Sequence, residues 1–154
     1  MCPSYSFDDE NEDIAEVKLQ NSLDESEAEN LINLPYLHEP AILHCLERRY
    51  TRSEIYTYTG PILIAMNPFK RVSLYTTQIL EQYYNRGVFI SQGIDSAATA
   101  PLPPHVYAIA DAAYRNMMTT INASRTGPKE TKNASGVVIN AADQAILISG
   151  ESGV

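Results

Sequence analysis

Two glycines near the end of the sequence, Gly150 and Gly153, follow a short apolar run, and their spacing could bind phosphate. In the loop pattern G-x-x-x-x-G-K-[ST], backbone N–H groups surround the phosphates, while the lysine and the hydroxyl reach the outer phosphates and magnesium. Gly150 takes the first position, and residues 151–154 take the four variable ones. The pattern therefore predicts the beginning of a phosphate-binding loop. Taken alone, Gly-x-x-Gly after an apolar strand is more often a tight turn.

The histidines and cysteines do not form a reactive set. His38, His44 and His105 lack the spacing of metal ligands, so structural roles are favoured for them. Cys45 belongs to the apolar face of an expected helix and has no companion base in the sequence, so we do not interpret it as a nucleophile. With only Cys2 besides it, the cysteine content fits a reducing compartment.

Two further polar groups have ordinary structural interpretations when taken alone. Arg48, Arg49 and Arg52 cluster where a helix should end, and cations suit that end of the helix dipole. We therefore interpret them as a solvated helix end rather than a phosphate site. Asn67-Pro68 follows an apolar run and is more often a strand terminator than a ligand contact.

These residues must be positioned by helices and strands. Pro40 opens an expected helix that runs to about Tyr50, because proline is tolerated in the first turn. The apolar face of this helix is formed by Ile42, Cys45, Leu46 and Tyr50. Residues 55–59 and 62–66 predict two strands joined by a turn at 60–61, as a hairpin or a sheet corner. The second strand is fully apolar, so we expect it to be buried on both faces.

A second helix is expected over residues 76–86, with Gly87 as its C-cap and a loop over 88–103. Residues 119–136 are polar and predict a mobile surface loop. Short strands are expected at 137–140 and at 145–149, where the latter leads into the phosphate loop.

The third expected helix begins at Pro104 and reaches about Met118. Asp111 and Arg115 form an i,i+4 pair on its outside. Its predicted buried stripe comprises Val106, Ile109, Ala110, Ala113 and Met117.

Charge is concentrated at the beginning of the chain. The net charge is -8, and residues 1–30 hold ten acidic residues against the single base Lys18. We expect a disordered acidic leader there, because such a segment buries too little apolar surface to offset the entropy of ordering. Its charge opposes nucleic-acid binding through this end. The sequence shows neither a signal peptide nor an apolar run long enough to span a membrane, which predicts a cytoplasmic location.

Five blocks of sequence together resemble the beginning of a myosin motor domain. In order along the chain they are LHEPAILH (37–44), IYTYTG (55–60), NPFKR (67–71), PHVYAIAD (104–111) and ILISGESG (146–153). The blocks occur in the order found in that family, and from the first to the last they span most of residues 34–154. This resemblance favours the nucleotide interpretation of the glycine-rich end.

The resemblance implies a bipartite nucleotide site. Asn67-Pro68 and Tyr75 match the N-P-x6-Y loop that contacts the purine in the family. The purine contacts implied by it are Asn67, Pro68, Lys70, Arg71 and Tyr75. The contacts implied in the phosphate loop are Gly150, Glu151, Ser152, Gly153 and Val154. Val154 departs from the family, which usually has alanine or serine at that position.

The implied cofactor of the intact parent is ATP with magnesium, and the magnesium ligands are not among residues 1–154. The implied partner is the actin filament, in the cytoskeleton, although the actin-binding region is not in this sequence. Light chains are compatible with the family, but the sequence shows no site for them. The myosin class, the direction of movement and the cargo do not follow from these residues.

The expected fold class is α/β: part of a P-loop NTPase motor domain, with helices packed on part of a twisted mixed sheet. Residues 1–30 are the expected leader, and residues 31–154 the N-terminal part of the motor domain, ending in the phosphate loop. We expect this fragment alone to be inactive as an ATPase. The alternative is a truncated, non-catalytic protein that binds a partner. Another P-loop NTPase would leave the N-P-x6-Y block unexplained.

Overall fold

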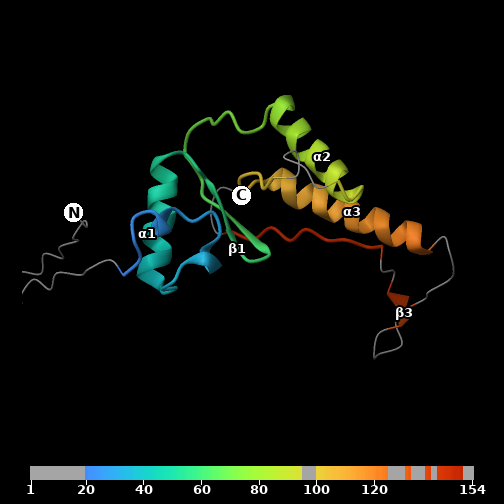
Figure 1. Cartoon of the computed structure of the whole chain (residues 1–154), viewed down its shortest axis with the longest axis horizontal. Helices are drawn as coiled ribbons and strands as arrows, with labels where there is room; N and C mark the ends of the chain where they lie inside the picture. The colour runs from blue at the N-terminus through green and yellow to red at the C-terminus, as the bar shows by residue number, and fades with distance from the viewer. Residues whose placement is uncertain (1–19, 95–99, 125–130, 133–137, 140–141, 151–154) are drawn as a thin grey trace, which may run out of the picture. The chain divides into compact units, whose positions relative to one another are not determined.

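The computed structural model describes residues 20–94, 100–124, 131–132, 138–139 and 142–150 (Figure 1). The chain divides into two compact units, Met1–Arg71 and Val72–Val154, and each is described by itself. Within the described ranges, no helix has the length and apolar character needed to cross a membrane.

Helix α1 (Glu39–Thr51) is the longest element of the first unit and confirms the predicted helix at Pro40. The Nδ1 atom of His38 accepts a hydrogen bond from the Ala41 N–H at 3.3 Å, which caps the helix. The residues of α1 that are buried are Ala41, His44, Cys45 and Arg49. This face is rotated from the predicted apolar stripe, of which only Cys45 is fully buried.

Strands β1 (Tyr56–Thr59) and β2 (Ile62–Ala65) form the predicted antiparallel hairpin. Gly60 turns the chain with a φ of 60°, a conformation that glycine adopts without steric penalty. The expectation that the second strand is buried on both faces is wrong, since the Ile62 side chain is 62% exposed and the other residues of β2 are at most half-buried. Among the described residues β2 pairs with β1 alone, so no further strand covers it.

Residues 20–34 are folded against α1, whereas the sequence predicts disorder up to residue 30. The 3-10 helix η1 (Glu25–Glu27) is preceded by a reciprocal pair of bonds of the capping-box type. The Ser22 hydroxyl accepts from the Glu25 N–H at 3.2 Å, and the Glu25 carboxylate accepts from the Ser22 N–H at 2.7 Å. A second 3-10 helix, η2 (Leu31–Asn33), places Leu31 in the core with Leu34 and Cys45. The rest of the expected leader, residues 1–19, lies outside the described residues.

In the second unit, helix α2 (Thr77–Ser91) lies beside helix α3 (Val106–Ser124) (Figure 1). The predicted C-cap at Gly87 is wrong, because α2 continues through Gly87 to Ser91. Gly87 is buried inside the helix, where a Cβ atom would collide with the side chains of Asp111 and Arg115 on α3. The glycine therefore serves the close approach of two helices and does not end one.

Helix α3 starts two residues after the predicted opening at Pro104 and continues beyond Met118. The predicted loop at 119–136 thus begins within a helix, and residues 125–130 and 133–136 of it lie outside the described residues. Of the predicted buried stripe, Ile109, Ala113 and Met117 are half-buried, whereas Val106 and Ala110 are exposed.

The predicted pair of Asp111 and Arg115 is confirmed, with 2.7 Å between Arg115 Nε and Asp111 Oδ2. It does not lie on the outside of the helix, since the two side chains are only 17% and 20% exposed. Arg115 also donates to the backbone carbonyl of Tyr84 on α2 at 3.0 Å, and its guanidinium lies over the Tyr84 ring. The pair therefore joins the two helices.

Strands β3 (Thr131–Lys132) and β4 (Val138–Ile139) form a second small antiparallel sheet, which confirms a short strand within residues 137–140. Residues 145–149 are described but form no strand, contrary to the prediction. A strand needs a partner for its backbone groups, and the described residues supply none for this segment. The described chain is mixed α/β, with helices and two two-stranded sheets.

Candidate nucleotide-binding site

The segment after β2 makes a tight turn at the first candidate purine contacts. The Asn67 Oδ1 atom accepts a hydrogen bond from the Phe69 N–H at 2.9 Å, which is an Asx turn. Phe69 has a φ of 48°, and its side chain is 87% exposed. Because Oδ1 is engaged within the turn, the amide NH2 of the exposed Asn67 is the group suited to a ligand. It would donate to an acceptor such as a ring nitrogen of adenine.

The basic residues of the same loop have different surroundings. The Lys70 Nζ atom donates to the Ser53 Oγ atom at 2.9 Å, which directs the lysine toward the end of α1. Arg71 is exposed and Pro68 half-buried. All four candidate residues before Tyr75 thus belong to the first unit, while Tyr75 belongs to the second.

Tyr75 lies at the edge of an aromatic cluster in the second unit, made of Tyr75, Tyr83, His105 and Tyr107. Its ring centroid is 5.8 Å from that of His105 and 6.4 Å from that of Tyr107. The side chain is 52% exposed, so one part packs on protein while another part faces outward. An aromatic ring held in this way can offer a flat surface to a purine.

His105 is the buried centre of this aromatic cluster, with 3% of its surface exposed. Its Nε2 atom lies 3.0 Å from the carbonyl oxygen of Leu74, and its Nδ1 atom accepts from the Tyr107 N–H at 3.1 Å. The Tyr83 ring stacks on it at a centroid distance of 5.1 Å. Burial lowers the pKa of the His105 imidazole, and its bond to the Leu74 carbonyl opposes this only in part.

The sequence interpretation gave His105 an unspecified structural role and did not connect it to Tyr75. A signal was present, because His105 immediately precedes the helical residues and can accept from the backbone N–H two positions on, as an N-cap does. The contact with Leu74 joins residues far apart in sequence, so no local pattern predicts it.

The candidate phosphate loop is described only at its first residue. Gly150 is exposed, and Glu151, Ser152, Gly153 and Val154 lie outside the described residues. The preceding apolar residues are open to solvent, with Leu147 91% and Ile148 74% exposed. The loop assignment therefore continues to rest on the sequence pattern.

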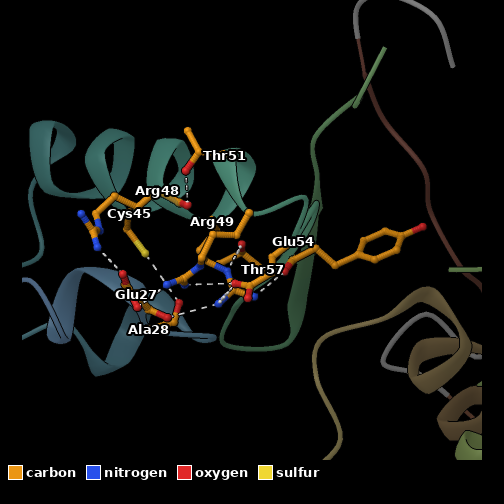
Figure 2. Close-up of polar contacts among 10 residues, drawn as sticks. Glu27, Ala28, Cys45, Arg48, Arg49, Thr51, Glu54 and Thr57 are labelled. Atoms are coloured by element: carbon orange, nitrogen blue, oxygen red, sulfur yellow. Dashed lines mark hydrogen bonds and ion pairs between the residues drawn. The ribbon is translucent and has the colours of Figure 1, made fainter. Parts of the chain in front are cut away.

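Arg49 is not part of a solvated helix end, which corrects that prediction. Figure 2 shows its side chain reaching from α1 toward η1 and the hairpin. Its guanidinium donates to Thr57 Oγ1 at 2.9 Å, to the Glu27 carbonyl at 3.1 Å and to the Tyr56 carbonyl at 3.0 Å. It is also 3.2 Å from the Glu54 carboxylate, while only 4% of its side chain is exposed. We call this set of contacts the Arg49 network.

The two neighbouring arginines pair with one carboxylate at the edge of the Arg49 network. Arg48 and Arg52 both form ion pairs with Glu27 (Figure 2 labels Arg48 and Glu27). Hydrogen bonds from the two guanidinium groups lower the pKa of Glu27 to about 2, and the bond from Arg52 has the larger effect. The arginines are thus engaged by acceptors of the protein, which accounts for them without a phosphate ligand.

Comparison with known proteins identifies the class. Residues 28–125 match the family described as myosin head (motor domain), which is a motor-protein domain. The chain therefore belongs to the myosin head family. The match begins directly after η1 and extends just beyond the last residue of α3. It includes the Asn67 turn, the aromatic cluster and, apart from Glu27, the Arg49 network.

Curated relatives agree with this family. Myosin-5 of Arabidopsis thaliana is 44% identical over 126 residues, which is 81% of this chain. The Myosin-H heavy chain of Dictyostelium discoideum is 35% identical over 138 residues, 90% of this chain. Myosin-1 of Saccharomyces cerevisiae is 36% identical over 126 residues. In each case the alignment spans 6% of the relative, so this chain corresponds to a small part of those proteins.

Proposed function

We propose that this chain is the N-terminal part of an actin-based motor that binds and hydrolyses ATP. The observation that carries the proposal is the family match over residues 28–125, within which the N-P-x6-Y block lies. The intact protein would act on actin filaments in the cytoplasmic cytoskeleton. In this chain we assign part of the nucleotide site and no part of the actin surface.

The purine half of the site would be formed by the loop after β2 and by Tyr75. The amide of Asn67 is supported as a donor by the Asx turn that engages its oxygen. Tyr75 is supported as a packing surface by its half-exposed ring. Pro68 would shape the loop, and Arg71 would lie near the base and sugar. Lys70 would have to leave Ser53 to do the same.

The phosphate half would be formed by the backbone N–H groups of residues 150–154. A P-loop also needs the second glycine of the pattern G-x-x-x-x-G-K-[ST], with the lysine and the hydroxyl that follow it. Residues 1–154 do not contain these three residues in the loop. ATP would be used with magnesium, whose ligands would come from a P-loop hydroxyl and from switch segments that residues 1–154 do not contain. We therefore propose that residues 1–154, produced alone, do not hydrolyse ATP.

The first test of this assignment is to read the gene or transcript beyond the codon for Val154. The expected continuation is Gly-Lys-Ser or Gly-Lys-Thr, followed by the switch motifs of a motor domain. A stop codon directly after Val154 would contradict the catalytic proposal. It would favour the alternative of a non-catalytic fragment that binds a partner.

The second test measures nucleotide binding in the longest product that this gene encodes. Tyr75→Ala should weaken ATP binding about 10-fold, which corresponds to about 1.4 kcal/mol. Tyr114→Ala is the matched control, because Tyr114 is also 52% exposed but lies on α3 outside the proposed site. Equal affinities for the two variants would remove Tyr75 from the site.

A third test concerns residues 1–154 alone. Phosphate release from ATP by the purified chain should equal that of a buffer blank. Turnover above the blank would show that the lysine and the switch segments are not needed, and would overturn the proposed mechanism.

A further inference from the structure

His105 makes contacts with two backbone segments through two different ring nitrogens. The Nδ1 atom accepts from the Tyr107 N–H at the start of α3, so it carries no proton. In the neutral ring the proton is then on Nε2, which donates to the Leu74 carbonyl at 3.0 Å. A single tautomer therefore satisfies both bonds, and it fixes the beginning of α3 to the residue just before Tyr75.

The rings around His105 reinforce this connection. Tyr107 lies 4.5 Å from His105 between ring centroids, and Tyr83 stacks on its face. The Tyr83 hydroxyl donates to the Pro103 carbonyl at 2.6 Å, which fixes the chain just before His105. With so little of its surface exposed, the imidazole has little freedom to adopt another rotamer.

We propose that His105 is a positioning residue for Tyr75. By holding the Leu74 carbonyl, it sets the backbone from which the Tyr75 ring projects, and its own ring supports one side of that ring. The inference rests on the proposed function, in which Tyr75 packs on the purine. It adds that the orientation of Tyr75 depends on a buried neutral histidine that makes no contact with nucleotide.

Two substitutions separate the two bonds. In His105→Asn, the shorter side chain can place an acceptor near the Nδ1 position for the Tyr107 N–H, but it does not reach Leu74. In His105→Gln, the longer amide can donate from near the Nε2 position to the Leu74 carbonyl, but it leaves the Tyr107 N–H without its acceptor. The positioning role therefore predicts that His105→Asn disturbs Tyr75 and spares the start of α3. It predicts the reverse for His105→Gln.

The experiment is NMR on the 154-residue chain with labelled tyrosine rings, together with thermal melting. In His105→Asn we expect a melting midpoint near that of the wild type, with Tyr75 ring signals shifted toward those of a freely rotating tyrosine. In His105→Gln we expect a lower midpoint with Tyr75 signals near those of the wild type. His38→Asn is the control, because His38 caps α1 in the first unit, and it should leave the Tyr75 signals unchanged.

Wild-type Tyr75 signals in a folded His105→Asn variant would overturn the proposal. If that variant does not fold, His105→Gln decides, since a freely rotating Tyr75 in the folded Gln variant would also overturn it.

Adenosine is then titrated into the wild type and both variants, as the probe of the purine half. We expect about 10-fold weaker binding in His105→Asn and near wild-type binding in His105→Gln. If adenosine leaves the wild-type Tyr75 signals unchanged while the variants behave as expected, the purine assignment fails and the positioning role stands. If adenosine shifts Tyr75 equally in all three proteins, the purine assignment stands and the positioning role fails.

Discussion

Each of the two units is stabilised internally by a different kind of buried polar residue. In the first unit, Arg49 joins η1, α1 and β1 through a charged guanidinium group. In the second unit, His105 joins the segment before α2 to α3 through a neutral imidazole. The comparison shows that a permanently charged group needs many acceptors and a carboxylate. A neutral group needs only two bonds, but it depends on its protonation state.

The largest expected effect tests the first half of this comparison. Arg49→Leu should lower the free energy of unfolding by about 3–5 kcal/mol, because it leaves buried acceptors, including the Thr57 hydroxyl, without their donor. Urea denaturation followed by circular dichroism measures the change. Arg52→Leu is the control, since its side chain is 40% exposed. Equal shifts for the two variants would contradict the special role of Arg49.

The second prediction tests how closely α2 and α3 must approach each other in the second unit. Gly87→Ala should lower the free energy of unfolding by about 1–3 kcal/mol, because the added methyl group displaces the Asp111–Arg115 pair. Alanine is otherwise the better helix former, so Asn85→Ala on the exposed side of α2 should be neutral or stabilising. Thermal melting of both variants gives the answer. A stabilised Gly87→Ala would show that the helices separate at little cost.

A third and smaller effect is the pH dependence of stability, to which a buried histidine of each unit contributes. The lowered pKa of His105 means that the unfolded chain binds its proton more tightly than the folded chain. Its contribution to stability is therefore fully present above the unfolded pKa of about 6.5 and is lost as pH falls from there through the folded pKa. Burial also lowers the pKa of His44 in the first unit, so it contributes in the same direction and window.

Melting midpoints measured between about pH 5 and pH 8 should therefore fall on acidification. The aromatic rings around His105 are those of Tyr75, Tyr83 and Tyr107. In His105→Gln the fall should be shallower, with the His44 contribution left. An identical slope in the variant would show that the ring of His105 is not what titrates.

The smallest effect concerns the exposed edge of the Arg49 network. Glu27→Gln removes the carboxylate that Arg48 and Arg52 share, and because these side chains are partly exposed the loss of stability should be slight. It should be measurable by denaturation at low salt and disappear at high salt, where the charges are screened. Because the pKa of Glu27 is lowered to about 2, the contribution is present above pH 4.5 and is lost as pH falls toward 2. A difference that persists at high salt would indicate a packing role for Glu27.

Much of the fold follows from local sequence, and the exceptions have physical causes. Helix α1 and the hairpin could be predicted because their signals are local. Pro40, the alternating residues of β1 and Gly60 each determine the backbone conformation of residues only a few positions away. Arg49 was misjudged because its acceptors come partly from a segment that composition alone marked as disordered. The S-x-x-E pattern at Ser22 was the available signal that this segment folds.

The strand pairing and the site depend on residues that are far apart in sequence, so local patterns predicted them less well than the helices. β2 and residues 145–148 are both entirely apolar, but whether such a run is buried or becomes a strand depends on what pairs with it. Gly87 was misread because its neighbour across the helix interface cannot be seen from the sequence of α2. The purine and phosphate contacts came from the family resemblance, and they stay predictions that binding measurements must test.

The burial of Cys45 means that its reactivity toward thiol reagents reports local opening of the first unit. The thiol is fully buried, its Sγ atom donates to the Ala28 carbonyl at 3.6 Å, and burial raises its pKa. A thiol-specific reagent attacks the thiolate, so it can reach this sulfur only while the segment around Ala28 is lifted from α1. The rate of labelling at Cys45 would then count those openings directly, without any engineered probe.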